Sequence, residues 1–75
     1  MPKIFSGQQV IKLLCRDFGF CFISQKGSHI KLAKRTGNKK IITIVPNHKE
    51  LALGTLNGVL RLAQINEKDF RKKAK

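Results

Sequence analysis

The tripeptide Gly27-Ser28-His29 places an imidazole directly after a short turn, with lysines close by at positions 26 and 31. Imidazole has an unperturbed pKa of about 6.5, so it can both accept and donate protons near neutral pH. The two ammonium groups favour a substrate that carries phosphate. These residue types in this order indicate a small acid–base site for a phosphodiester, with His29 as its candidate catalytic group.

The histidine opens a predicted strand that runs from His29 to Lys34. Side chains alternate between the two faces of a strand, so Ile30 and Leu32 are expected to face the core. His29 and Lys31 then share the opposite, open face. We therefore expect the imidazole to be accessible to a substrate.

Three neighbours of the histidine are candidates for binding phosphate: Lys26, Ser28 and Lys31. Each has a plainer alternative. Basic side chains on a strand often do no more than protect a sheet edge in solvent, and serine is a common turn residue. The residues alone leave both interpretations open.

A single histidine suits the cleavage of RNA, because RNA carries its own nucleophile. Removal of the 2′-hydroxyl proton drives in-line attack on the adjacent phosphate and leaves a 2′,3′-cyclic phosphate. General acid–base help is worth roughly 10²–10⁴-fold, which suffices for a slow ribonuclease. The only acidic residues are Asp17, Glu50, Glu67 and Asp69, too few for a carboxylate–metal nuclease. No metal or other cofactor is expected.

The second histidine, His48, lies in a predicted loop from Asn47 to Gly54. It is a secondary candidate for an acid or a base. The alternative is a loop residue that shapes the start of the following helix.

Sixteen Lys and Arg residues face four Asp and Glu residues in a chain of 75, which gives a formal net charge of +12. Such an excess predicts a polyanionic partner, either nucleic acid, an acidic protein or an anionic membrane. A basic domain without a specific partner is the alternative. No apolar run approaches the ~20 residues of a membrane span, and no signal-peptide pattern is visible.

The two cysteines, Cys15 and Cys21, have neither a CxxC spacing nor a zinc-ligand pattern with the histidines. We expect both to be buried free thiols, which fits a reducing cytoplasm.

Apolar periodicity predicts one domain over residues 1–75, with the element order α-β-β-β-α. A capping box of Ser6 and Gln9 begins the first helix, and Gly19 follows its end. Strands are expected over 20–25, 29–34 and 41–45, and a second helix over about 55–64. Asn66 caps a last short turn or helix, Phe70 docks on the core, and 71–75 form a frayed basic end. The result is a two-layer α+β domain whose helices cover one face of a three-stranded antiparallel sheet.

A family resemblance is carried by Ser6-Gly7, Val10-Ile11-Lys12-Leu13-Leu14, Gly19-Phe20, Gln25-Lys26-Gly27-Ser28-His29, Val45-Pro46, His48, Lys49-Glu50-Leu51, Gly54-Thr55-Leu56, Val59-Leu60 and Ala63-Gln64-Ile65. With these motifs in this order, the chain from about Ile4 to Phe70 resembles HicA-type toxins, the small mRNA interferases of toxin–antitoxin pairs. Leu32 stands where members of that family commonly have an aromatic residue.

The resemblance implies a double-stranded-RNA-binding-domain-like fold, which agrees with the element order. It implies ribosome-independent cleavage of mRNA without a metal, with the histidine of the Gly-Ser-His motif, here His29, as the catalytic residue. It also implies a HicB-type antitoxin protein that covers this histidine. Two rival functions remain open: a non-catalytic RNA-binding module of the same fold, and a basic protein whose only partner is another protein.

Overall fold

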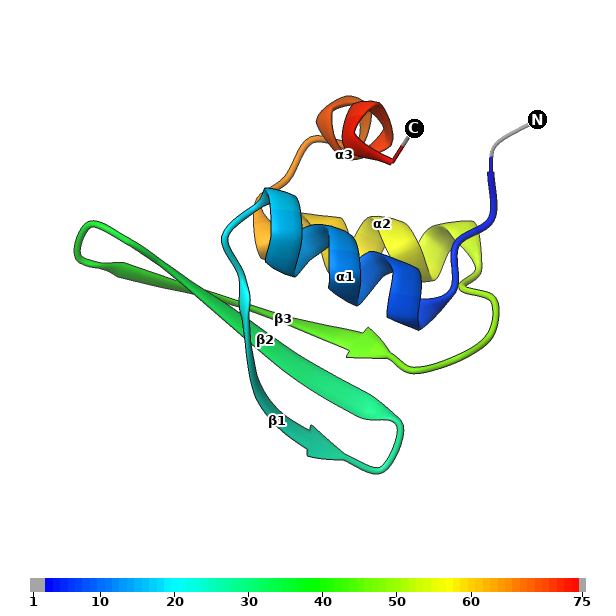
Figure 1. The fold of residues 1–75 in the computed structure, drawn as a ribbon, viewed down its shortest axis with the longest axis horizontal. Helices are drawn as coiled ribbons and strands as arrows, with labels where there is room; N and C mark the ends of the chain where they lie inside the picture. Colours follow the sequence, from blue (N-terminus) through cyan, green and yellow to red (C-terminus); the bar gives the residue numbers. More distant parts are fainter. Residues whose placement is uncertain (1–2, 75) are drawn as a thin grey trace.

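The computed structural model describes residues 3–74 and contains three helices and three strands within that range. Their bounds are α1 (Gly7–Asp17), β1 (Cys21–Lys26), β2 (His29–Thr36), β3 (Lys39–Pro46), α2 (Leu53–Ala63) and α3 (Glu67–Lys73). The strands form one antiparallel sheet in the order β1-β2-β3. Helices α1 and α2 lie along one side of this sheet, and α3 lies beyond them, away from the strands (Figure 1). The predicted small α+β fold is confirmed.

Helix α1 begins as the sequence predicts. The Ser6 hydroxyl accepts a hydrogen bond from the Gln9 backbone N–H at 3.0 Å, and the Ser6 N–H donates to Gln9 Oε1 at 2.8 Å. This reciprocal capping box satisfies two backbone donors at the start of the helix. The apolar stripe of α1 packs Val10, Leu13 and Leu14 into the core.

The sheet buries only the face that lies against the helices. Ile30 pairs with Val45 and Leu32 pairs with Thr43, and all four side chains are buried. The Thr43 hydroxyl donates to the Val59 carbonyl of α2 at 2.8 Å. A buried hydroxyl without a partner would be costly, so this bond lets a polar residue connect β3 to α2 inside an apolar core.

Strand β1 contains a β-bulge that the sequence pattern does not predict. Phe22 pairs with Leu32, but the next paired residue of β1 is Ser24, opposite Lys31. Ile23 is therefore an extra residue, and after it the alternation of β1 is reversed. Without the bulge, Ser24 would lie on the same face of the sheet as Phe22.

Both hairpins are tighter than predicted. Strand β2 continues to Thr36 and β3 begins at Lys39, because a two-residue loop joins them in place of the predicted four-residue turn over 35–38. Helix α2 begins at Leu53 instead of about Thr55. The types and order of the elements follow the hydrophobic pattern, and the boundaries shift with the pairing of the strands.

Residues 71–73 are helical where the sequence predicts a frayed end over 71–75, and Lys75 lies outside the described residues. Helix α3 continues through Lys73, and the Asn66 side chain caps it by accepting from the Lys68 N–H at 2.8 Å. Phe70 has no exposed surface and meets Phe5 edge to face, with 5.2 Å between ring centroids. The predicted docking of Phe70 on the core is confirmed, and that docking keeps α3 folded.

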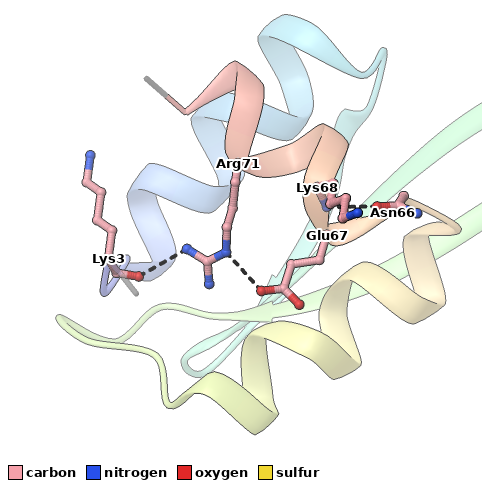
Figure 2. Close-up of polar contacts among 5 residues, drawn as sticks. All are labelled: Lys3, Asn66, Glu67, Lys68 and Arg71. Carbon is pink, nitrogen blue, oxygen red and sulfur yellow. Dashed lines mark hydrogen bonds and ion pairs between the residues drawn. The ribbon is translucent and has the colours of Figure 1, made fainter. Parts of the chain in front are cut away.

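Arg71 strengthens the attachment of α3. Its Nε donates to Glu67 Oε2 at 2.9 Å, and its Nη1 lies 3.5 Å from the Lys3 carbonyl oxygen, as Figure 2 shows. Its guanidinium lies over the Phe5 ring, 5.6 Å from the centroid. The segment before α1 and the last helix are thus held together by one aromatic pair and one arginine.

The expectation of two buried thiols is wrong for Cys21, which is exposed, and Cys15 is half-buried. All six residues of β1 are exposed, because neither helix covers this edge strand. Burial raises the pKa of the Cys15 thiol, and the nearby Cys21 adds to the rise. None of the helices within residues 3–74 is both long and apolar enough to cross a membrane.

Substitution Phe70→Ala should lower the free energy of unfolding by about 3–5 kcal/mol, because it removes a fully buried ring. Phe22→Ala is the matched control, since Phe22 is 57% exposed and its loss should cost less than about 0.5 kcal/mol. Urea unfolding followed by far-UV circular dichroism measures both, as the chain has neither Trp nor Tyr. Equal stability of the two variants would show that α3 is not part of the cooperative core.

Candidate functional site

A hollow of about 450 Å³ lies on the sheet face that the helices leave open. It is lined by Ser24, Lys26, His29, Lys31 and Ile44, and we call it the His29 hollow. The strand register explains the grouping: Lys26 pairs with His29, and Lys31 pairs with both Ser24 and Ile44. Side chains directly opposite each other on neighbouring strands project to the same face. Three strands thus each supply at least one residue to a single site.

The bulge in β1 decides which residues of that strand reach the hollow. Strict alternation from Phe22, which pairs with the core residue Leu32, would direct Ser24 and Lys26 to the helix side. The extra residue Ile23 reverses this order, so Ser24 and Lys26 lie on the same face as His29. The second cation of the hollow depends on that one insertion.

The turn before His29 is a two-residue hairpin loop of Gly27 and Ser28. Gly27 has a φ of +58°, which a residue with a side chain rarely adopts, and Gln25 Nε2 donates to its carbonyl at 2.9 Å. A glycine at the first position is what a tight hairpin of the II′ type requires. The turn therefore holds Lys26 and His29 opposite each other at the end of the sheet.

A chain of hydrogen bonds ties this turn to the start of α1. The Asn47 N–H donates to the Ser28 carbonyl at 2.6 Å, and Gln8 Nε2 donates to Asn47 Oδ1 at 2.8 Å. The Gly7 N–H donates to the His48 carbonyl at 2.8 Å. The loop after β3 is thereby fixed between the helix and the residue that precedes His29.

Gly7 allows this contact because it has no side chain. A Cβ placed on Gly7 would lie 2.1 Å from the Pro46 carbonyl oxygen and 3.0 Å from the Asn47 Cα. Both neighbours are backbone atoms, so they cannot move aside as a flexible side chain would. The glycine of the Ser6-Gly7 motif thus has a packing role at the base of the site.

Of the residues that the sequence singles out, His29 and Lys26 are exposed in the hollow and Lys31 is half-buried there. Ser28 and His48 are exposed but do not line it. The Ser28 carbonyl accepts from Asn47, and the carbonyl of His48 accepts from Gly7 at the start of α1. The His48 contact is thus to the first helix and not to the helix that follows the loop.

Two lining residues were not foreseen from the sequence. The position of Ile44 could have been predicted from the sequence pattern. It lies between the buried residues Thr43 and Val45 on one strand, so its side chain must point to the opposite face of the sheet. Ser24 was not, because its position follows from the bulge and no local signal marks the bulge.

The hollow is cationic and suits an anion. Its lining includes two lysines and one imidazole and, among residues 3–74, no carboxylate. No three His, Cys, Asp or Glu side chains of the described part of the chain gather closely enough to hold a metal ion. An exposed imidazole in the same hollow as two ammonium groups can exchange a proton with a hydroxyl of a bound phosphate ester, while the lysines neutralise the charge on the phosphate oxygens.

The fold is that of a small basic α+β protein with a cationic hollow on the open face of its sheet. Residues 7–65 match the family model described as the HicA toxin of bacterial toxin–antitoxin systems, and the chain belongs to this family. It is therefore the toxin of a toxin–antitoxin pair, as its resemblance implies. No curated protein matched the chain. The matched segment includes the whole His29 hollow and ends before α3.

Substitution Gly7→Ala should destabilise the fold by about 3 kcal/mol, since the new methyl group overlaps backbone atoms. Gly58→Ala provides the control: it lies within α2, has nothing within 4 Å of an added Cβ, and should gain up to about 1 kcal/mol from helix propensity. Thermal unfolding of both variants measures the difference. Equal melting temperatures would contradict the close approach of α1 to the loop after β3.

Proposed function

We propose that this toxin is an endoribonuclease that cleaves mRNA without a metal ion and uses His29 as its catalytic acid or base. The observation that supports the proposal most directly is the exposed imidazole of His29 in a cationic hollow on the open sheet face. Membership of the HicA family adds that the chain acts as a toxin. Its site of action is the cytoplasm, where mRNA is found.

In the proposed reaction, RNA binds with one phosphate between Lys26 and Lys31. The His29 imidazole removes the proton of the neighbouring ribose 2′-hydroxyl, and the 2′-oxygen attacks the phosphorus. The bond from phosphorus to the 5′-oxygen breaks, and that oxygen takes up a proton from water or from the imidazolium. The products are a 2′,3′-cyclic phosphate and a 5′-hydroxyl, with no electron transfer and no co-reactant beyond solvent.

The lysines have an electrostatic role. Negative charge increases on the phosphate oxygens as the 2′-oxygen attacks, and fixed cations stabilise that state more than the ground state. Lys31 is the better positioned of the two, because it is half-buried and lies on the central strand of the sheet. Lys26 lies at the hairpin end directly opposite His29.

The other two candidates receive minor roles. The Ser28 hydroxyl is exposed in the turn and is available to a phosphate only at the margin of the hollow. His48 lies outside the hollow and is only a secondary candidate for an acid or a base. Both residues are expected to contribute much less to cleavage than His29.

The antitoxin partner is proposed to be a HicB-type protein that covers the open sheet face. Ile23 and Ile42 expose 48% and 40% of their surface. Ile42 pairs with Ala33, two residues beyond Lys31 on β2, and Ile23 lines a second hollow together with Ala33, so both lie near the His29 hollow. Exposed apolar side chains grouped beside a functional site are typical of an interaction surface. A partner that buries them would also close the approach to His29.

Substitution His29→Ala should reduce the rate of RNA cleavage by at least about a hundredfold, because it removes the acid–base group. Purified protein is incubated with single-stranded RNA in the presence of EDTA, and the products are analysed for 2′,3′-cyclic phosphate ends. The wild-type chain should cut despite EDTA, and DNA of the same sequence should remain intact because it lacks the 2′-hydroxyl.

His48→Ala is the matched control, a second exposed histidine outside the hollow, and it should retain most of the activity. Two results would overturn the proposal. RNA binding without cleavage would support the non-catalytic module, and full activity of the His29→Ala variant would remove the catalytic role of that residue.

Substitution Ile42→Asp should weaken binding of the antitoxin by about tenfold or more, since it buries a carboxylate at an apolar contact. Leu62→Asp is its control, because Leu62 is 56% exposed on α2, away from the open sheet face. Titration of each variant with the co-expressed partner by calorimetry gives the two affinities. A larger loss for Leu62→Asp would place the partner on the helical side instead.

A further inference from the structure

A second cationic site lies on the helical side of the molecule. Helix α1, the segment before it and the end of α3 enclose a hollow of about 200 Å³, which we call the α1–α3 basin. Its charged lining residues are Lys3, Lys12, Arg16 and Lys73. Helix α1 lies between α3 and the sheet (Figure 1), and the basin is lined by residues of α1 and α3, whereas the His29 hollow is lined by residues of the three strands.

The charges of the basin come from three separate parts of the chain. Lys12 and Arg16 lie one turn apart on α1, so they project from one side of that helix. Arg16 is partly neutralised, because its Nη2 lies 2.8 Å from Asp17 Oδ2, and this hydrogen bond lowers the pKa of the Asp17 carboxyl. Lys3, which precedes α1, and Lys73, at the end of α3, are the other two basic residues that line the basin. Lys73 is also close enough to Asp17 to help lower the pKa of that carboxyl, but none of the three lysines of the basin forms an ion pair within residues 3–74, so all three can attract an anion.

The basin exists only because α3 is attached. Phe70 packs against Phe5. Arg71 connects Glu67 to the Lys3 carbonyl, as Figure 2 shows. These contacts bring Lys73 to the same hollow as Lys3. Both lysines lie outside the segment over residues 7–65 that matches the HicA family model. Two of the four basic residues that line the basin thus lie outside the segment that matches the family model.

The chemistry of the basin favours phosphate over protein. Its apolar floor, Phe5 and Leu13, is buried and offers little surface to a protein partner. None of the large apolar side chains that are exposed within residues 3–74, among them Ile4, Ile42 and Leu62, lines the basin. What the basin presents is a group of lysine ammonium ions, which bind phosphate oxygens as point charges.

We propose that the α1–α3 basin is a second RNA-binding site, which holds backbone phosphates of the RNA at a distance from the bond that is cut. This inference rests on the proposed function in one respect, that RNA is the ligand. Because the basin and the His29 hollow lie on different sides of the molecule, one RNA strand reaches both only if it is long and flexible. The basin then increases affinity for long transcripts and takes no part in the chemical step.

The test compares two double variants that change the net charge equally. Lys12→Glu/Lys73→Glu reverses two charges of the basin, and Lys39→Glu/Lys68→Glu reverses two exposed lysines that line neither hollow. Binding to a long 2′-O-methyl RNA, which lacks the free hydroxyl needed for cleavage, is measured by fluorescence anisotropy over a range of salt concentrations. Circular dichroism verifies that both variants are folded.

Each phosphate contact contributes about 0.7 to the slope of log affinity against log salt for a single strand. The basin variant should therefore lower that slope by about one or more and weaken binding by about tenfold at low salt. The control variant should lose clearly less. A trinucleotide of the same chemistry, too short to span both sites, should show a much smaller difference between the two variants.

Equal losses in the two variants would overturn the inference, because net charge alone would then explain binding. An unchanged slope in the basin variant, or no RNA binding by the wild-type chain, would overturn it as well. The proposed nuclease function is judged separately. A wild-type chain that binds RNA through the basin but never cuts it would refute the nuclease and leave the second site in place.

Discussion

Burial of one face of the sheet beneath α1 and α2 is the constraint on which the rest of this structure depends. Strands β2 and β3 alternate with period two, so packing Ile30, Leu32, Thr43 and Val45 under the helices sends every intervening side chain to the other face. His29 and Lys31 are among those intervening residues. Their exposure follows from the packing of their neighbours, and a one-residue slip of register would bury the imidazole and expose the core.

The end of the sheet that carries His29 is held more firmly than an exposed edge usually is. Gly7 brings the start of α1 against the backbone of Pro46 and Asn47, and Asn47 in turn holds the Ser28 carbonyl. The turn before the histidine is therefore anchored to a helix instead of projecting freely into solvent. Side chains act more reliably on a substrate when the backbone beneath them has few alternative positions.

The distribution of charge over the molecule follows from its folding. Two of the four acidic residues pair with arginines, Asp17 with Arg16 and Glu67 with Arg71, and neither pair lies at the His29 hollow. Within residues 3–74, none of the lysines that line the two cationic hollows takes part in an ion pair. Like charges that gather on a small domain repel one another, and a polyanionic ligand relieves that repulsion. This gives one physical reason for a net charge of +12 on so short a chain.

The sequence by itself determined the order and types of the elements, the capping box of Ser6 and Gln9, the burial of Ile30 and Leu32, and the outward position of His29 and Lys31. All of these depend on local periodicity and capping, which are written in neighbouring residues. Only the tertiary structure decided that Ser24 and Lys26 join His29, that Cys21 is exposed, and that α3 folds against Phe5 to bring Lys73 beside Lys3. Those features depend on a bulge, on an uncovered edge strand and on contacts between the two ends of the chain. Such long-range pairings leave no periodic signal in the residues that make them.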